Sequence, residues 1–106
     1  MLVADRIYDL ASIFRSKNSG PFEITIDILF DNIAAYQRVK ESGVITKETV
    51  MEMYGLTEES IRCIVFFDAA MGIKITYLRQ ISSGTAGDRD VYGAQQHPPL
   101  MNLMIP

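Results

Sequence analysis

The segment from 22 to 30 constrains the fold of this chain more than any other part of the sequence. It reads Phe-Glu-Ile-Thr-Ile-Asp-Ile-Leu-Phe, so every second position from Phe22 to Phe30 is apolar. Side chains alternate between the two faces of a β-strand, and a slip of one residue would expose all five apolar side chains. The pattern therefore predicts a strand with one face on a hydrophobic core and a firmly set register.

Two later segments also have the composition of strands. Residues 61–67, Ile-Arg-Cys-Ile-Val-Phe-Phe, are almost continuously apolar, which is typical of a central strand covered on both faces. Residues 73–79 alternate again, with every second position from Ile73 to Tyr77 apolar. The short stretch 68–72 between them suits a turn, so we expect these two strands to form a hairpin.

Helical spacing predicts a first helix over residues 2–16. Its apolar positions recur at intervals of three and four residues and form one stripe. They are Val3, Ile7, Leu10, Ala11 and Phe14. Gly20 and Pro21 follow shortly afterwards and are residues that end helices.

Capping residues predict two further helices. The second begins after Asp31 or Asn32 and ends at Gly43, while the third begins after Thr46 and ends at Gly55. Asp, Asn and Thr accept hydrogen bonds from the first free amides of a helix, and glycine adopts the left-handed conformation that closes one. A short helical turn is expected over residues 57–60.

The order of these elements predicts an α+β fold. We expect a small two-layer domain, with about three helices packed on a mixed or antiparallel sheet of three to four strands. The chain has 106 residues, which suits a single domain over 1–106. Residues 1–81 would form the α+β core, and residues 82–106 a long functional loop and an apolar tail. The tail, Leu100 to Ile105, is expected to be an edge strand or a docking segment.

Composition excludes several classes of function. Ten basic and thirteen acidic side chains give a net charge of −3, which argues against a nucleic-acid partner. No apolar run approaches the ~20 residues of a membrane span, and we expect a cytoplasmic protein without a membrane partner. Cys63 is the single cysteine and His97 the single histidine. Cys63 most simply fits a buried position in a strand, and we expect no metal site and no cofactor.

The polar loop before the tail contains the candidate catalytic residues. His97 has an ordinary pKa of ~6.5, which suits proton transfer near neutrality. Asp90 and Tyr92 would assist it, and Gln95 and Gln96 would bind a carboxylate or carbonyl oxygen. A lone loop histidine is more often a hydrogen-bonded surface residue, and that alternative stays open.

A second candidate site follows the first predicted helix. Arg15, Lys17 and Asn18 combine two cations with an amide and would bind a carboxylate or phosphate. A helix end with cations matched to the helix dipole explains the same residues without a ligand, and we favour that interpretation.

Three acidic or polar residues share one face of the strand over 22–30. Glu23, Thr25 and Asp27 would lie ~6.6 Å apart along that face, a spacing that suits acid–base work or a hard cation. The solvated face of an amphipathic strand predicts the same residues. We favour this second interpretation unless Lys74 or Arg79 approaches them.

Three stretches together resemble a known family. They run from Arg15 to Asp27, from Val65 to Lys74, and from Gly87 to His97, the last ending in Tyr-Gly-Ala-Gln-Gln-His. The chain resembles a small family of unknown function whose members occur alone or joined to acyclic-terpene-utilisation (AtuA-like) proteins. The resemblance implies a companion subunit or domain of an AtuA-like protein in organic-acid or acyl-CoA catabolism. It also implies that the polar segments converge on one edge of the sheet.

Three functions are therefore expected in this order. The first is an accessory subunit that docks on an AtuA-like chain through the apolar tail and contributes an interface or half of a shared site. The second is a small lyase, hydratase or isomerase for a carboxylate substrate, with His97 as the general acid–base and Arg15 as the carboxylate clamp. The third is a homo-oligomeric interaction protein with no small ligand.

Overall fold

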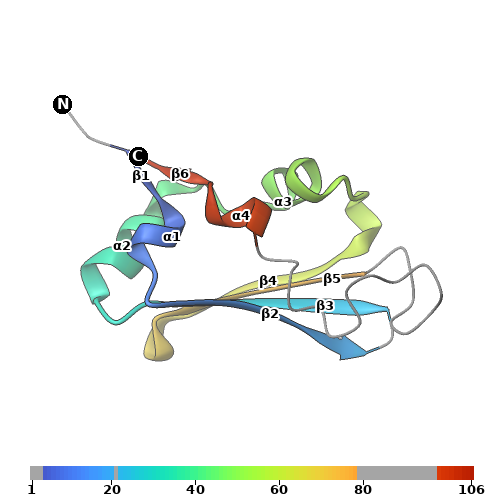
Figure 1. The fold of residues 1–106 in the computed structure, drawn as a ribbon, viewed down its shortest axis with the longest axis horizontal. Coiled ribbons are helices and arrows are strands. Elements are labelled where there is room, and N and C mark those ends of the chain that lie inside the picture. Colours follow the sequence, from blue (N-terminus) through green and yellow to red (C-terminus); the bar gives the residue numbers. More distant parts are fainter. Residues whose placement is uncertain (1–3, 21, 79–97) are drawn as a thin grey trace.

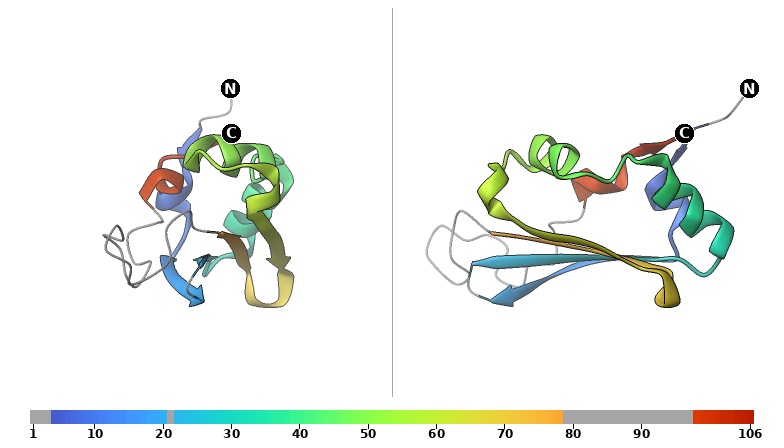
Figure 2. Two further views of the ribbon diagram at one scale, coloured as in Figure 1. Left: turned by 90° about the vertical axis from the view of Figure 1, so that its right-hand side faces the viewer. Right: turned by 180° about the vertical axis from the view of Figure 1, so that it is seen from behind.

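The computed structural model describes residues 4–20, 22–78 and 98–106. They form an α+β domain in which a four-stranded antiparallel sheet carries every described helix on one face (Figures 1 and 2). The spatial order of the main sheet is β2 (Ile13–Gly20), β3 (Glu23–Leu29), β5 (Gly72–Leu78) and β4 (Ile61–Phe67). The α+β class predicted from the element order is confirmed.

The second layer contains helices and a small two-stranded sheet. The helices are α1 (Ile7–Leu10), α2 (Ile33–Ser42), α3 (Lys47–Tyr54) and α4 (Pro98–Met101). The small sheet pairs β1 (Asp5–Arg6) with β6 (Met104–Ile105), and short 3₁₀ turns lie at η1 (Glu58–Ser60) and η2 (Asp68–Ala70). The predicted helical turn over 57–60 is confirmed by η1.

The alternating segment forms strand β3, as predicted, and β3 is one of the two inner strands of the main sheet. Ile24, Ile26 and Ile28 are each 0% exposed and belong to the same hydrophobic core as the buried helix residues Ile7, Tyr36, Val39 and Val50. Their neighbours in β5, which include Ile73 and Ile75, are also buried on this inner face. The core therefore lies between the inner face of the sheet and the helical layer.

The two predicted internal helices are confirmed together with their caps. The Asn32 side chain accepts hydrogen bonds from the first amides of α2, and Gly43 ends the helix with a left-handed backbone at φ 69°. Thr46 caps α3 through the amide of Thr49, and Gly55 ends it at φ 64°. Both glycines occupy a region of φ that other residues rarely adopt, which explains the sharp helix ends.

The predicted β4–β5 hairpin is confirmed, but the position predicted for β4 is wrong. β4 lies at the edge of the sheet and pairs with β5 alone. Most of its side chains are half-buried or exposed, including Cys63, which we expected to be buried. Because the position of a strand depends on which strands it pairs with, an apolar run does not by itself show that a strand is central.

The predicted helix over 2–16 is wrong for most of its length. Within the described residues, helix is confined to the single turn α1, and the chain then extends as β2. The amide and hydroxyl of Ser12 both donate to the Leu29 carbonyl, at 2.8 and 3.1 Å, and begin the pairing with β3. The segment joins a one-turn helix to a strand, and this junction produces the helical spacing of its apolar residues. The pairing of β2 with β3 outweighs the local preference of these residues for a helix.

Part of the predicted apolar tail over residues 100–105 packs into the domain's own core. Leu100 and Ile105 are 0% exposed and belong to the same core as Ile7. The predicted edge strand is present here as β6, which pairs with β1. The segment therefore contributes to the chain's own core while Met104 remains 49% exposed, and its predicted role in docking stays a prediction.

Arg38 of α2 connects the helix to both strands of the small sheet. Its guanidinium donates to Asp5 Oδ2 at 2.8 Å and to the carbonyls of Ile105 and Pro106 at 3.2 and 3.1 Å. A planar donor with several N–H groups suits this arrangement better than a lysine ammonium would. Arg38 thus ties α2 to segments that are far apart in the chain.

We predict that Arg38→Met lowers the free energy of unfolding by about 1–3 kcal/mol, because it removes charge-assisted hydrogen bonds in one step. Chemical denaturation followed by circular dichroism would measure the change. Gln37→Met, at an exposed position of the same helix, is the control. Equal stabilities of the two variants would show that the Arg38 contacts contribute nothing measurable.

Candidate functional site

The outer face of the main sheet is the surface that no described helix covers (Figures 1 and 2). It consists of the side chains on the opposite side of the sheet from Ile24, Ile26 and Ile28. Its residues are Ile13, Arg15, Lys17, Glu23, Thr25, Asp27, Leu29, Arg62, Cys63, Val65, Phe67, Gly72, Lys74, Thr76 and Leu78. Strand pairing arranges them in rows across the sheet.

The first row is apolar and crosses all four strands. Ile13 pairs with Leu29, Leu29 with Gly72, and Gly72 with Phe67. A Cβ on Gly72 would lie 2.7 Å from Leu29 Cδ2, so glycine leaves room for the leucine to lie across the sheet. Ile13 and Phe67 at the two ends are 44% and 48% exposed. The row is therefore apolar across the sheet and exposed at its two ends.

The second row carries charge. Arg15 pairs with Asp27, which pairs in turn with Lys74. The Arg15 Nε and Asp27 Oδ2 atoms are 3.7 Å apart, which is a long ion pair with an exposed arginine. Such a pair contributes little to stability because solvent screens it. Asp27 thus lies between two cations on neighbouring strands.

The third row contains Lys17, Thr25, Thr76 and Cys63. The hydroxyls of Thr25 and Thr76 are 3.2 Å apart and hydrogen-bond to each other, although both residues are buried. A polar pair that satisfies itself avoids the cost of burying an unbonded hydroxyl. The expectation that this part of β3 is simply solvated is wrong at Thr25.

An irregularity in β4 adds a further cation to the outer face. The register between β4 and β5 shifts between Ile61 and Cys63, so Arg62 lies at a bulge. Its Nε is 3.5 Å from Glu23 Oε1 on β3. Bulges re-aim side chains at sheet edges, and here the arginine reaches a carboxylate two strands away.

The structure describes three of the predicted ligand-binding residues, and two of them lie on the outer face. Arg15 and Lys17 lie on the outer face of β2, so the favoured interpretation as a helix end is wrong. Asn18 alternates with them and pairs with Ile24, whose side chain faces the core, so it does not join them.

The remaining sequence-predicted residues cannot be placed. Asp90, Tyr92, Gln95, Gln96 and His97 lie outside the described residues, as does Arg79. Their proposed roles in proton transfer and substrate binding stay predictions.

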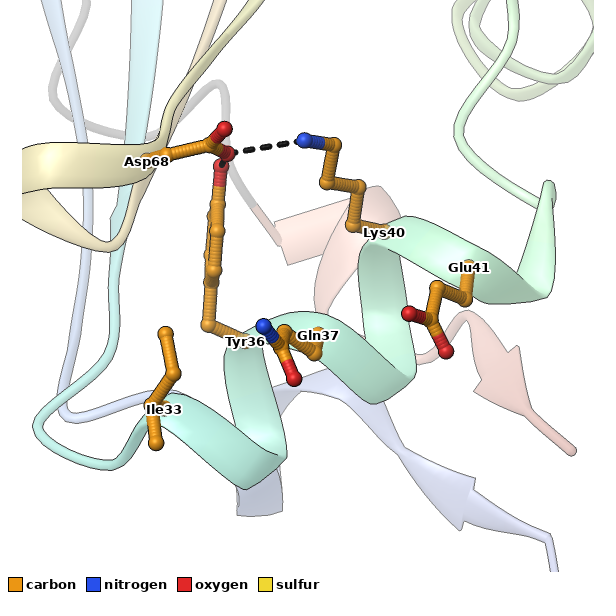
Figure 3. Close-up of a pocket in the computed structure, with 6 residues that line it drawn as sticks. All are labelled: Ile33, Tyr36, Gln37, Lys40, Glu41 and Asp68. Carbon is orange, nitrogen blue, oxygen red and sulfur yellow. Dashed lines mark hydrogen bonds and ion pairs between the residues drawn. The ribbon is translucent and has the colours of Figure 1, made fainter.

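A pocket of about 190 Å³ lies between α2 and the turn that joins β4 to β5 (Figure 3). Its lining residues are Ile33, Tyr36, Gln37, Lys40, Glu41 and Asp68. Tyr36 Oη donates to Asp68 Oδ1 at 2.6 Å, and Lys40 Nζ reaches the same oxygen at 2.8 Å. The two donors therefore hold the turn against α2.

Near neutral pH the Tyr36 phenol is protonated and the Asp68 carboxyl is ionised. Burial, and secondarily the hydrogen bond to Asp68, raises the pKa of Tyr36 to about 12. The Lys40 hydrogen bond, with a second contribution from Tyr36, holds the pKa of Asp68 below its ordinary value. A neutral phenol and an ionised carboxylate suit a structural clasp, whereas a general acid or base works best with a pKa near the working pH.

Sequence reasoning singled out Asp68 only as part of a motif and did not pair it with Tyr36. The two residues are 32 positions apart and belong to different elements. The spacing of residues along the sequence does not reveal such a contact, because the contact depends on how the hairpin turn packs against α2. The Tyr36 side chain is buried, with 1% of its surface exposed.

Tyr54 is a second tyrosine with an unusual environment. Its ring packs 5.3 Å from that of Tyr77, centroid to centroid, and its buried hydroxyl makes no well-formed hydrogen bond within the described part of the chain. Burial raises the pKa of Tyr54, and the backbone near Leu100 offsets part of the shift. A buried hydroxyl without a well-formed hydrogen bond costs free energy that a phenylalanine would not.

We predict opposite outcomes for two Tyr→Phe variants. Tyr36→Phe lowers the melting temperature because Asp68 loses a donor, whereas Tyr54→Phe leaves it equal or higher because a buried hydroxyl without a well-formed hydrogen bond is removed. Thermal denaturation of both variants beside the wild type measures the difference. Destabilisation by Tyr54→Phe equal to that by Tyr36→Phe would mean that the Tyr54 hydroxyl makes a stabilising hydrogen bond.

We predict that Tyr36 ionises near pH 12 and that Asp68→Asn lowers this pKa without returning it to 10, because burial is the larger cause. Because folding raises this pKa, the associated stability is complete below pH ~10 and is lost as the pH rises through the folded value. Asp68 has the opposite sign, so its contribution is lost as the pH falls below ~4. NMR titration of the tyrosine ring carbons measures the Tyr36 pKa, and an identical value in Asp68→Asn would refute the coupling.

Within residues 4–20, 22–78 and 98–106, no three His, Cys, Asp or Glu side chains cluster as metal ligands would. None of the helices described there has the length and apolar character needed to cross a bilayer.

The fold and surface define an α+β domain with an outer sheet face that no described helix covers. The sequence from 7 to 104 matches a family described as a domain of unknown function (DUF4387), and the chain belongs to this family. No curated protein and no solved structure shows a significant match. The description of the family says nothing of AtuA-like proteins, so that association stays a prediction.

Proposed function

We propose that this chain is an accessory subunit or domain that docks on a larger partner through its outer sheet face. The partner is an AtuA-like protein of organic-acid or acyl-CoA catabolism, and the chain contributes an interface or part of a shared site. The resemblance of the segments Arg15 to Asp27 and Gly87 to His97 to an AtuA-associated family supports this choice of partner.

One observation carries the proposal, namely the apolar row with exposed ends on the outer face of the sheet. Exposed apolar side chains scattered singly are ordinary on protein surfaces. Ile13, Leu29 and Phe67 instead form one row in register across the sheet. A contiguous apolar strip with a polar rim is typical of a protein interface.

The outer face also fits docking better than proton transfer. Its described charged groups are carboxylates, guanidinium groups and ammonium groups, and its threonine pair is already bonded internally. The described pocket holds a neutral phenol and an ionised carboxylate. These features support recognition of a protein surface, with any chemistry completed by the partner.

We predict that the chain co-purifies with a co-expressed AtuA-like protein and that Ile13→Ser combined with Phe67→Ser weakens the complex by about tenfold or more. The loss follows because both ends of the apolar row are truncated. Isothermal titration calorimetry on the purified components would measure the dissociation constant.

Ile33→Ser is the matched control, because Ile33 is 52% exposed on α2 and does not belong to the outer face. The proposal requires this variant to bind like the wild type. A complex that resists the double change but is weakened by Ile33→Ser would place the interface on the helical layer. A chain that stays monomeric beside the AtuA-like protein would contradict the proposed function altogether.

A further inference from the structure

We infer that the surface recognised by the outer face is acidic and that Lys17 and Lys74 receive its carboxylates. The inference rests on the proposed function, since it describes the part of the partner protein that docks. It follows from the distribution of charge, from the pairing of charges within the sheet, and from the position of the two lysines.

Charge is divided unevenly between the two sides of the domain. The outer face has four basic residues, Arg15, Lys17, Arg62 and Lys74, and two acidic ones, Glu23 and Asp27. The other described residues include nine acidic and four basic side chains. A chain with a net charge of −3 therefore presents a locally basic sheet face. Complementary potentials across an interface guide association and favour the correct partner.

The carboxylates of this face are already paired with arginines. Glu23 Oε1 lies 3.5 Å from Arg62 Nε, and Asp27 Oδ2 lies 3.7 Å from Arg15 Nε. Lys17 and Lys74 take part in none of the ion pairs formed among the described residues. The excess positive charge of the outer face is therefore carried by these two ammonium groups.

The two lysines lie on either side of the buried threonine pair. Lys17 is in β2 beside Thr25, whereas Lys74 is in β5, one row from Thr76 and adjacent to the apolar row. With β3 between them and one row of offset, their backbones are roughly 12 Å apart. Two carboxylates of a partner at a similar spacing would reach both lysines while its apolar side chains cover Ile13 and Phe67.

A second copy of this chain fits the same face poorly. Stacking two outer faces would place one basic surface against another, which costs free energy at low salt. Stacking the outer face on the acidic side of another copy would join unlike surfaces and generate an open-ended array rather than a closed dimer. An acidic face of a different protein has neither disadvantage.

The test compares single charge reversals in the complex with the AtuA-like protein. We expect Lys17→Glu and Lys74→Glu each to weaken binding by about tenfold at low salt and to flatten its salt dependence. Lys47→Glu makes the same change in net charge at an exposed position of α3 and is expected to change binding less than about twofold. Calorimetry at two salt concentrations, with circular dichroism as a check of folding, provides the measurements.

The other possible results separate failure of the acidic-surface inference from failure of the proposed function. Loss of binding in the Ile13→Ser, Phe67→Ser variant together with unchanged binding in both lysine reversals would overturn the acidic surface and leave the proposed function standing. Equal weakening by Lys47→Glu would also overturn it, because net charge rather than the outer face would then govern binding. A wild-type chain that forms dimers through this face, or that fails to bind the AtuA-like protein, would overturn both.

Discussion

One-sided burial of β3 is the constraint on which the rest of this structure depends. Ile24, Ile26 and Ile28 all lie in the core that the helices share, and the strand's register with β2 and β5 is fixed by that requirement. Burial of this stripe directs the helical layer to one side of the sheet. The outer face is consequently built from the alternate residues, and its rows are a direct result of the same register.

Closure of the helical layer depends on segments that are distant in the sequence. Ile7, Leu100 and Ile105 fill the core beside α2, and the small β1–β6 sheet holds the two end segments together. Arg38 binds both strands of that sheet. Leu100 and Ile105 are therefore buried within the domain, while the outer face carries a row of apolar residues in register across the sheet.

The sequence predicted the elements whose signals are local. Alternation identified β3 and β5, and the capping residues Asn32, Gly43, Thr46 and Gly55 gave both helix boundaries. Sequence-based prediction failed for the two strands whose structure depends on long-range pairing. β2 is a strand because it pairs with β3, and β4 lies at the edge because of the order of the strands in the sheet.

Prediction of the candidate site was partial for the same reason. Arg15 and Lys17 were selected for their chemistry, yet their neighbours Thr25, Asp27 and Lys74 are known only from strand register. The contact between Tyr36 and Asp68 joins a helix to a hairpin turn, and no periodic pattern reports it. Residue type indicated which groups were able to bind a partner, whereas topology determined which of them lie together.

The position of Cys63 allows the most direct test that the outer face is the interface. This single cysteine lies in the third row of the outer face and is half-buried, so its thiol reports on the surface without further substitution. The measurement is the rate at which a maleimide modifies Cys63 in the free chain and in the complex. A Cys63→Ser, Glu48→Cys variant places the thiol on α3 as the control. Docking through the outer face predicts slow modification of Cys63 in the complex and an unchanged rate for the control thiol, whereas the reverse pattern would contradict it.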